Sequence, residues 1–236
     1  MTSCSDDGCV CRTEPASAVP LPTPHVHDPS HAAPANEHGH AHHHAHQHGH
    51  QHGHEPGPLA DASVRRARPS DAPAVGIVQA QAMAADYAQI LPPQALAELD
   101  PATFGSVWRR SLAEPPSPRH LLLVACAGEQ VVGFAAFGPS EDPDADDETA
   151  ELLTLSVHPQ ARGEGHGSRL VNAVVDDARS RGFTWLHAWV LLDTPQYRDF
   201  LQRAGMAPDR ARRTRAVDDE RTVMEVRLGA GLGTDE

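Results

Sequence analysis

The most informative segment of the chain is Leu155-Ser-Val-His-Pro-Gln-Ala-Arg-Gly-Glu-Gly-His-Gly-Ser-Arg-Leu170. Its pattern predicts a buried strand, then a glycine-rich turn, then the start of a helix. The turn contains three glycines, Gly163, Gly165 and Gly167, which let the backbone approach a ligand closely. Free N–H groups and the positive dipole end of the following helix attract an anion. Arg162 adds positive charge and Ser168 adds a hydroxyl donor, so the segment predicts a pyrophosphate site.

Two other kinds of phosphate loop fit this segment poorly. The Walker loop requires a Lys followed by Ser or Thr, and the chain contains no Lys. The dinucleotide-binding fingerprint has the spacing G-x-G-x-x-G early in a βαβ unit. Here the spacing is G-x-G-x-G, and it occurs late in the folded part of the chain. The segment therefore favours a different type of anion site.

The same residues resemble the hallmark of the GNAT N-acetyltransferase family, Q/R-x-x-G-x-G/A, which Arg162, Gly165 and Gly167 match. The flanking residues also agree, and the order of elements agrees across residues 62–229. The resemblance implies that acetyl-CoA binds with its pyrophosphate on the turn and its pantetheine arm along the preceding strand. It also implies that this strand and the next one splay apart to admit the cofactor. The implied cofactor-binding residues are Leu155, Ser156, Val157, Arg162, Gly163, Glu164, Gly165, His166, Gly167 and Ser168.

Strand and helix patterns alternate from Val64 onward. We expect strands at Val64–Arg68, His120–Cys126, Val131–Gly138, Ala150–Val157, Phe183–Leu191, Ala211–Val217 and Thr222–Leu228. We expect helices from Ser70 or Asp71 to about Ala85, over Pro93–Leu112 with an interruption near Asp100–Pro101, from about Gly165 to Arg181, and over Pro195–Ala204. This order predicts an α/β fold, a GNAT-like mixed β-sheet flanked by helices.

The composition divides the chain in two. Residues 1–60 are rich in Pro, Ala, Gly and His with almost no large apolar side chains, so we expect a disordered tail. Residues 61–230 are expected to form the folded domain, and residues 231–236 a disordered C-terminus. Cys126 lies in an apolar run and is expected to be a reduced core thiol.

Charge and hydropathy exclude some classes of partner. A formal net charge of −13 argues against nucleic acid as the main ligand, because counterion release needs a basic surface. No stretch approaches the roughly 20 apolar residues of a membrane span, and the N-terminus lacks the pattern of a signal peptide. We therefore expect a cytoplasmic protein. The resemblance implies that its partner is a small-molecule or peptide amine. The sequence leaves the oligomeric state open.

Acyl transfer to an amine needs a base to remove the ammonium proton. The resemblance implies that Glu151 is this base, since several relatives carry a glutamate near the start of the cofactor strand. Alternation along the strand places Glu151, Leu153, Leu155 and Val157 on one face. The alternative is a carboxylate at the strand end that only faces solvent.

The acid that would protonate the departing thiolate is less evident. Relatives often carry a Tyr in the last helix, and Leu201 stands at that position. Tyr197 lies one turn earlier on the same helical face, which makes it the candidate acid. A packing role for Tyr197 is the alternative. Loss of the acid need not abolish activity, because a CoA thiolate is a tolerable leaving group near neutral pH.

An acidic run and several histidines border these elements. Glu141–Glu148 carries six carboxylates in eight residues, which is typical of a solvated loop and could instead attract a cationic amine. His158 and His166 flank the phosphate turn and are interpreted as loop residues. His120 and His187 are interpreted as strand residues without chemistry.

The N-terminal tail suggests metal binding, because it combines thiols with many imidazoles. It resembles the His-rich extensions of bacterial nickel- and zinc-handling proteins. The candidate ligands for Zn or Ni are Cys4, Cys9, Cys11, His38, His40, His42, His43, His44, His46, His48, His50, His52 and His54. Two hypotheses follow: an acetyltransferase moving an acetyl group from acetyl-CoA to an amine, or a metal-binding or sensing protein with a degenerate acyl-CoA domain.

Overall fold

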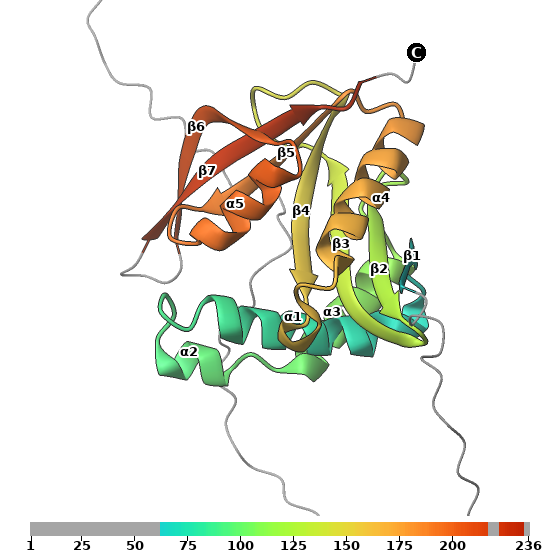
Figure 1. Cartoon of the computed structure of the whole chain (residues 1–236), viewed down its shortest axis with the longest axis vertical. Coiled ribbons are helices and arrows are strands. Elements are labelled where there is room, and N and C mark those ends of the chain that lie inside the picture. Colours follow the sequence, from blue (N-terminus) through green and yellow to red (C-terminus); the bar gives the residue numbers. More distant parts are fainter. Residues whose placement is uncertain (1–61, 217–221, 234–236) are drawn as a thin grey trace, which may run out of the picture.

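The computed structural model describes residues 62–216 and 222–233, which form one seven-stranded sheet with helices around it (Figure 1). The strand order is β1-β2-β3-β4-β5-β7-β6. In chain order the strands are β1 (Ala62–Arg66), β2 (Leu121–Ala127), β3 (Gln130–Pro139), β4 (Thr149–Val157), β5 (Trp185–Leu191), β6 (Ala207–Ala216) and β7 (Thr222–Gly231). Neighbours pair antiparallel except β4 and β5, which are parallel. The predicted mixed sheet is therefore confirmed.

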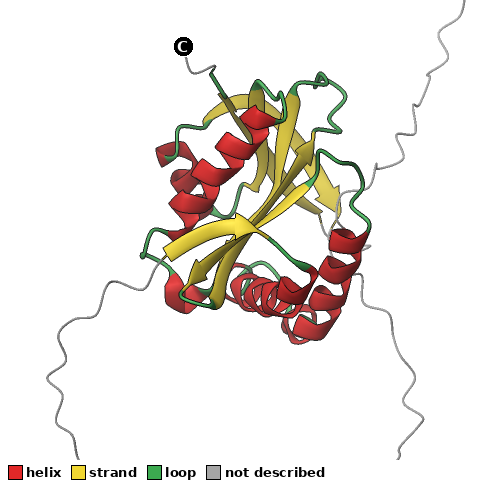
Figure 2. Cartoon of the chain, turned by 90° about the vertical axis from the view of Figure 1, so that its right-hand side faces the viewer, coloured by secondary structure: helices red, strands yellow, loops and turns green. Residues whose placement is uncertain are grey.

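Helices cover both faces of this sheet, as Figure 2 shows. They are α1 (Ala72–Asp86), α2 (Pro93–Ala97), α3 (Pro101–Ala113), α4 (His166–Ser180) and α5 (Pro195–Arg203). Helices α1 and α3 pack on one face, where Trp108 meets Phe134 edge-on with ring centroids 5.4 Å apart. Helices α4 and α5 pack on the other face, around Leu170 and Leu201, both fully buried. The two apolar cores together hold the β4 region rigidly between layers.

The helix starts follow local sequence signals, with one difference from expectation. Asp100 caps α3, because its carboxylate accepts hydrogen bonds from Ala102 N at 3.1 Å and Thr103 N at 2.8 Å. Asp71 precedes α1 but does not cap it. Its carboxylate accepts from the backbone of Arg68 at 2.7 Å and pairs with Arg65 at 2.6 Å. The Arg65 hydrogen bonds hold the pKa of Asp71 below its usual value.

Strand boundaries differ from the sequence-based ones by a few residues. Strand β1 begins and ends two residues earlier than expected, and β5 begins at Trp185 because Phe183 packs beneath the sheet instead. Strand β6 begins at Ala207, ahead of an irregularity at Arg210, whose φ is 76°. Pro208 and this irregularity hide the strand from a search for regular alternation. Strand β7 runs to Gly231, three residues beyond its expected end.

None of the helices within residues 62–216 and 222–233 is long and apolar enough to cross a bilayer. The Cys/His-rich segment 1–60 lies outside the described residues, as do residues 217–221 and 234–236.

Candidate active site

The central feature of the site is a gap between two neighbouring strands. Strands β4 and β5 form only three residue pairs, the last joining Glu151 to His187. Beyond that pair, β4 continues to Val157 and β5 to Leu191 without a ladder between them, and the two strands diverge in Figure 1. The backbone of β4 from Leu152 onward is therefore not paired with β5. The structure confirms the splayed strands that the sequence resemblance implies.

The glycine-rich turn lies at the end of β4, beside the gap. Gly163 and Gly165 have φ values of 85° and 83°, a left-handed conformation that glycine adopts at little cost. Gly165 is the N-cap of α4, so the N–H groups of His166, Gly167 and Ser168 have no partner within the helix. These donors and the helix dipole make the turn a suitable anion site.

The guanidinium of Arg162 is held differently from expectation. Its two terminal nitrogens donate to the carboxylate of Asp86, at the end of α1, at 2.8 and 3.0 Å. Its Nε donates to the carbonyl of Val157 at 3.1 Å. The charge of Arg162 is thus already paired, although both partners are more than a third exposed and the pair contributes under about 1 kcal/mol.

Arg169, in the first turn of α4, is a further cation beside the glycine-rich turn, and it is not among the cofactor-binding residues that we expected. One terminal nitrogen donates to the carbonyl of Glu164 at 2.9 Å, and the guanidinium lies against Gly165. Within the described part of the chain, no carboxylate lies within 4 Å of it. Arg169 therefore places a second positive charge at the turn, in addition to that of Arg162.

His166 is buried in the first turn of α4 and is not the loop residue that we expected. Its side chain is 2% exposed, and its Nε2 lies 3.4 Å from a carboxylate oxygen of Glu164. Its Nδ1 has no hydrogen-bond partner among the described residues. The burial of His166 could have been predicted from the helical period, because position 166 lies one turn before the buried stripe of Leu170, Val174 and Ala178.

Strand β4 contains a β-bulge that changes which side chains share a face. Leu152 pairs with Phe137 and Thr154 with Ala136, so Leu153 is an extra residue without a cross-strand partner. Leu153 packs in the α1–α3 core, whereas Leu155 and Val157 pack against the α4 core. The predicted single face of Glu151, Leu153, Leu155 and Val157 is therefore wrong. Glu151 lies on the face opposite to Leu155 and Val157.

Glu151 belongs to a group of four polar residues, here called the His187 cluster: Ser140, Asp142, Glu151 and His187. His187 Nε2 lies 3.1 Å from Ser140 Oγ, 3.5 Å from Asp142 Oδ2 and 3.7 Å from Glu151 Oε2. The side chains of Asp142, Glu151 and His187 are 11, 14 and 2% exposed. Sequence reasoning missed His187, because its partners come from elements distant in the chain.

The acidic segment Glu141–Glu148 contributes Asp142 to this cluster and is fastened to β5 and β7. Asp142 accepts from Trp189 Nε1 at 2.8 Å and from Arg227 at 3.0 Å. Arg227 also donates twice to Asp144, at 2.7 and 2.6 Å. These hydrogen bonds, with Asp144 the strongest, raise the pKa of Arg227 above its usual value. The segment is therefore a fixed border of the site.

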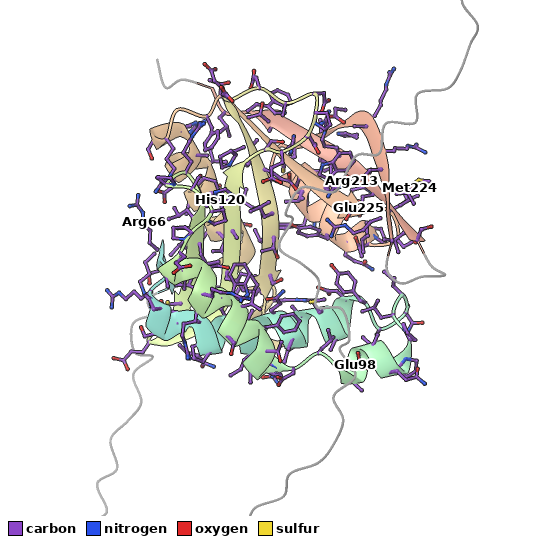
Figure 3. All side chains as sticks on the ribbon, turned by 180° about the vertical axis from the view of Figure 1, so that it is seen from behind. Arg66, Glu98, His120, Arg213, Met224 and Glu225 are labelled. Atoms are coloured by element: carbon purple, nitrogen blue, oxygen red, sulfur yellow. The ribbon has the colours of Figure 1, made fainter. Side chains whose placement is uncertain are left out.

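The same sheet face continues from the His187 cluster onto β5, β6 and β7. Trp189 lies under the guanidinium of Arg213, 4.3 Å from the ring centroid. Arg213 donates to the buried carboxylate of Glu225 at 2.5 Å, and Figure 3 shows these two side chains together on β6 and β7. This face offers an aromatic ring and charges of both signs beside the gap.

Tyr197 lies on α5 near the turn, whereas Leu201 points into the core and is fully buried. The Tyr197 ring stacks on Phe200, whose own ring approaches Gly167. Burial raises the pKa of the Tyr197 hydroxyl well above its usual value, and Tyr87 and Asp86 at the end of α1 contribute in the same direction. The hydroxyl thus keeps its proton and can donate a hydrogen bond.

The predicted metal ligands fall outside this site. Cys4, Cys9, Cys11 and the histidines from His38 to His54 lie outside the described residues. Among the residues that are described, no group of three or more His, Cys, Asp or Glu side chains could hold a metal ion. Cys126 is a buried free thiol in β2, as expected.

Comparison with known proteins gives consistent matches for the folded domain. A sequence model of the acetyltransferase (GNAT) family matches residues 84–206. N-acetyltransferase 8F1 of Rattus norvegicus is 43% identical over 61 residues, which are 26% of this chain and 28% of the relative. The chain thus matches less than a third of the length of this curated relative.

Solved structures match over a larger share of the chain. The yncA protein of Salmonella typhimurium, solved with its cofactor acetyl-CoA, has a TM-score of 0.54 at 20% identity, covering 73% of this chain and 94% of that one. The paia N-acetyltransferase of Thermoplasma acidophilum, solved with coenzyme A, has a TM-score of 0.56 at 17% identity, covering 70% and 98%. At these identities the likeness concerns the fold.

Proposed function

The chain belongs to the acetyltransferase (GNAT) family, and we therefore propose that it transfers an acetyl group from acetyl-CoA to an amine. The acceptor is a small molecule, a protein N-terminus or a side chain. The observation that carries this proposal is the gap between β4 and β5, which ends beside a turn with two left-handed glycines. An anion on the turn and an extended arm in the gap would fit one ligand.

The residues of the gap suit acetyl-CoA, which supplies the acyl group as a thioester. The amides of residues 162–168 and the guanidinium of Arg169 would hold the pyrophosphate. The backbone of Leu155, Ser156 and Val157, which is not paired with β5, would pair with the pantetheine amides like an added strand. The bulge at Leu153 places Glu151 on the opposite face, so the acceptor would approach from the side of the His187 cluster.

Glu151 is the proposed base. Its carboxylate is mostly buried, lies where β4 and β5 part, and accepts no hydrogen bond from a described residue within 3.5 Å. An unbonded carboxylate at this place can accept a proton from the acceptor ammonium directly or through one water.

The direct test of the function is a thiol-release assay on the full chain. Acetyl-CoA would be mixed with a panel of amines, containing small primary amines, peptides with free N-termini and peptides with a single Lys. Release of the CoA thiol that depends on one class of amine, with the acetylated product seen by mass spectrometry, supports the proposal. Binding of acetyl-CoA without release for any class contradicts it.

Tyr197 is the proposed acid, and Tyr197→Phe tests it. Its protonated hydroxyl can stabilise the departing thiolate, so we expect kcat to fall by about tenfold. The KM for acetyl-CoA should change by less than about twofold, since the ring still stacks on Phe200. An unchanged kcat in Tyr197→Phe would assign the residue to packing.

We also propose a metal-binding role for the tail, on the basis of its ten histidines between His38 and His54 and its three cysteines. A reducing cytoplasm would keep these thiols available to Zn or Ni. Calorimetric titration of Zn²⁺ and Ni²⁺ into the full chain should show uptake in the micromolar range or tighter. A full-length variant with these ten histidines replaced by Ser should lose most of it, and equal uptake by both chains would refute the role.

A further inference from the structure

We propose that His187 is a positioning residue for the acyl transfer, which receives through Glu151 the proton that leaves the acceptor ammonium. This inference rests on the proposed function and deepens it. It is carried by the contacts of the His187 cluster, which bring a buried imidazole from β5 within 4 Å of two carboxylates.

The position of His187 is the first argument. Glu151 and His187 form the last pair of the β4–β5 ladder, so both residues stand where the two strands part. The imidazole is 2% exposed and Glu151 is 14% exposed. Glu151 therefore keeps some access to solvent, whereas His187 beside it is shielded. A proton that reaches Glu151 therefore has the imidazole nitrogen of His187 within 3.7 Å.

The hydrogen bonds of His187 are the second argument. Ser140 Oγ accepts a hydrogen bond from Asp142 N at 3.1 Å, and it lies 3.1 Å from His187 Nε2. The Ser140 hydroxyl can donate its proton to the neutral Nε2, or accept a hydrogen bond from a protonated one. Asp142 and Glu151 then flank the protonated ring. The cluster thus accommodates both protonation states of His187 without moving its backbone.

A comparison within the molecule is the third argument. His120 also bonds a serine, Ser117, at 2.9 Å, and burial lowers its pKa. No carboxylate lies within 4 Å of His120 among the described residues. His120 therefore has the features of a structural histidine, whereas His187 has two carboxylates that could pass it a proton or hold it charged.

The acyl transfer releases one net proton, which the His187 cluster would take up. An acceptor ammonium loses one proton to Glu151, and its lone pair then forms the C–N bond to the thioester carbonyl carbon. The C–S bond breaks, and the sulfur leaves with its electron pair as a thiolate. The nitrogen loses its second proton as the amide forms, and the sulfur takes up one proton. One net proton must therefore leave the reacting atoms. Glu151 takes it up and shares it with His187 while the C–N bond forms, and Glu151, which is the more exposed of the two, then releases it to solvent.

The first test compares two variants of the full chain. His187→Gln keeps a polar group near Nε2 but cannot carry a proton, and His120→Gln is the matched control. We expect His187→Gln to lower kcat by about tenfold and to displace the pH at which kcat reaches half its maximum. KM for acetyl-CoA should stay within about twofold. The charged groups around His187 are Glu151 from β4 and Asp142 and Asp144 from the loop before β4. Arg213 from β6 and Arg227 from β7 pair with Asp142.

A uniform loss of rate at all pH values would assign His187 a purely structural role and overturn the inference. If the wild-type chain releases no CoA thiol with any amine, the proposed function fails instead. A second measurement then decides the inference without turnover. The ring ¹⁵N signals of His187, identified by their loss in His187→Gln, should change with pH differently in Glu151→Gln. Identical signals in wild type and Glu151→Gln would show that the two residues share no proton.

Discussion

Acetyl-CoA binding should weaken by at least about a hundredfold when Gly165 is replaced by Asp. The substitution puts a carboxylate at the N-terminus of α4, where the unpaired amides of the first turn point at the proposed pyrophosphate. The new charge would accept hydrogen bonds from these amides itself and repel the phosphates. A side chain at a φ of 83° also costs about 1 kcal/mol, less for Asp than for most residues. Calorimetric titration of acetyl-CoA into the full chain measures the effect.

Gly182→Asp is the matched control for this variant. Gly182 also has a left-handed φ, 78°, and lies just beyond the other end of α4, where a Cβ would meet no other atom. It therefore imposes the same backbone strain and the same charge away from the turn. We expect it to bind acetyl-CoA like the wild type. Equal weakening in both variants would mean that strain, and not the anion site, explains the loss.

The second large effect should come from Glu151→Gln, which removes the proposed base while keeping the shape of its side chain. We expect kcat to fall by about a hundredfold, which lies within the usual range for loss of a general base. Acetyl-CoA binding should be unchanged, because Glu151 faces away from Leu155 and Val157 across the sheet. Steady-state kinetics with the best acceptor from the amine panel measure the first quantity, and calorimetry the second.

Glu129→Gln gives the comparison for Glu151→Gln, since Glu129 is an exposed carboxylate in the turn between β2 and β3. It changes the net charge by the same amount and should leave kcat within about twofold. The loss in Glu151→Gln should shrink at high pH, where more of the acceptor amine is already unprotonated. A loss that is independent of pH would argue against proton removal by Glu151.

Much of the fold could be predicted from the sequence, because the strongest signals are local. The period of α4, the cap at Asp100 and the glycine-rich turn each depend on residues a few positions apart. The splayed strands came from the family resemblance and not from any local pattern. Element ends were the weakest part, as in β6, where Pro208 and the irregularity at Arg210 interrupt the alternation.

The parts that escaped prediction depend on contacts between distant segments or on a single inserted residue. The bulge at Leu153 is invisible in a run of apolar residues, because both faces of β4 are buried there. The pairing of Arg162 with Asp86 joins positions 76 residues apart, and no local pattern announces it. His187 has no signal in its own strand, since its significance lies in Asp142 and Glu151. Only the burial of His166 could have been read from the helical period.

The ladder of three residue pairs between β4 and β5 is the shortest connection between neighbouring strands of the sheet. Strands β1 to β4 and strands β5 to β7 form two hydrogen-bonded groups, which are joined only by the three residue pairs at one end of β4 and β5. Acetyl-CoA bound between β4 and β5 would contact both groups of strands and so connect them where the ladder is missing. At a free acetyl-CoA concentration of a hundred times Kd, binding would add about 2.7 kcal/mol to the free energy of unfolding. The concentration of acetyl-CoA would then affect the stability of the folded protein as well as its rate of acetyl transfer.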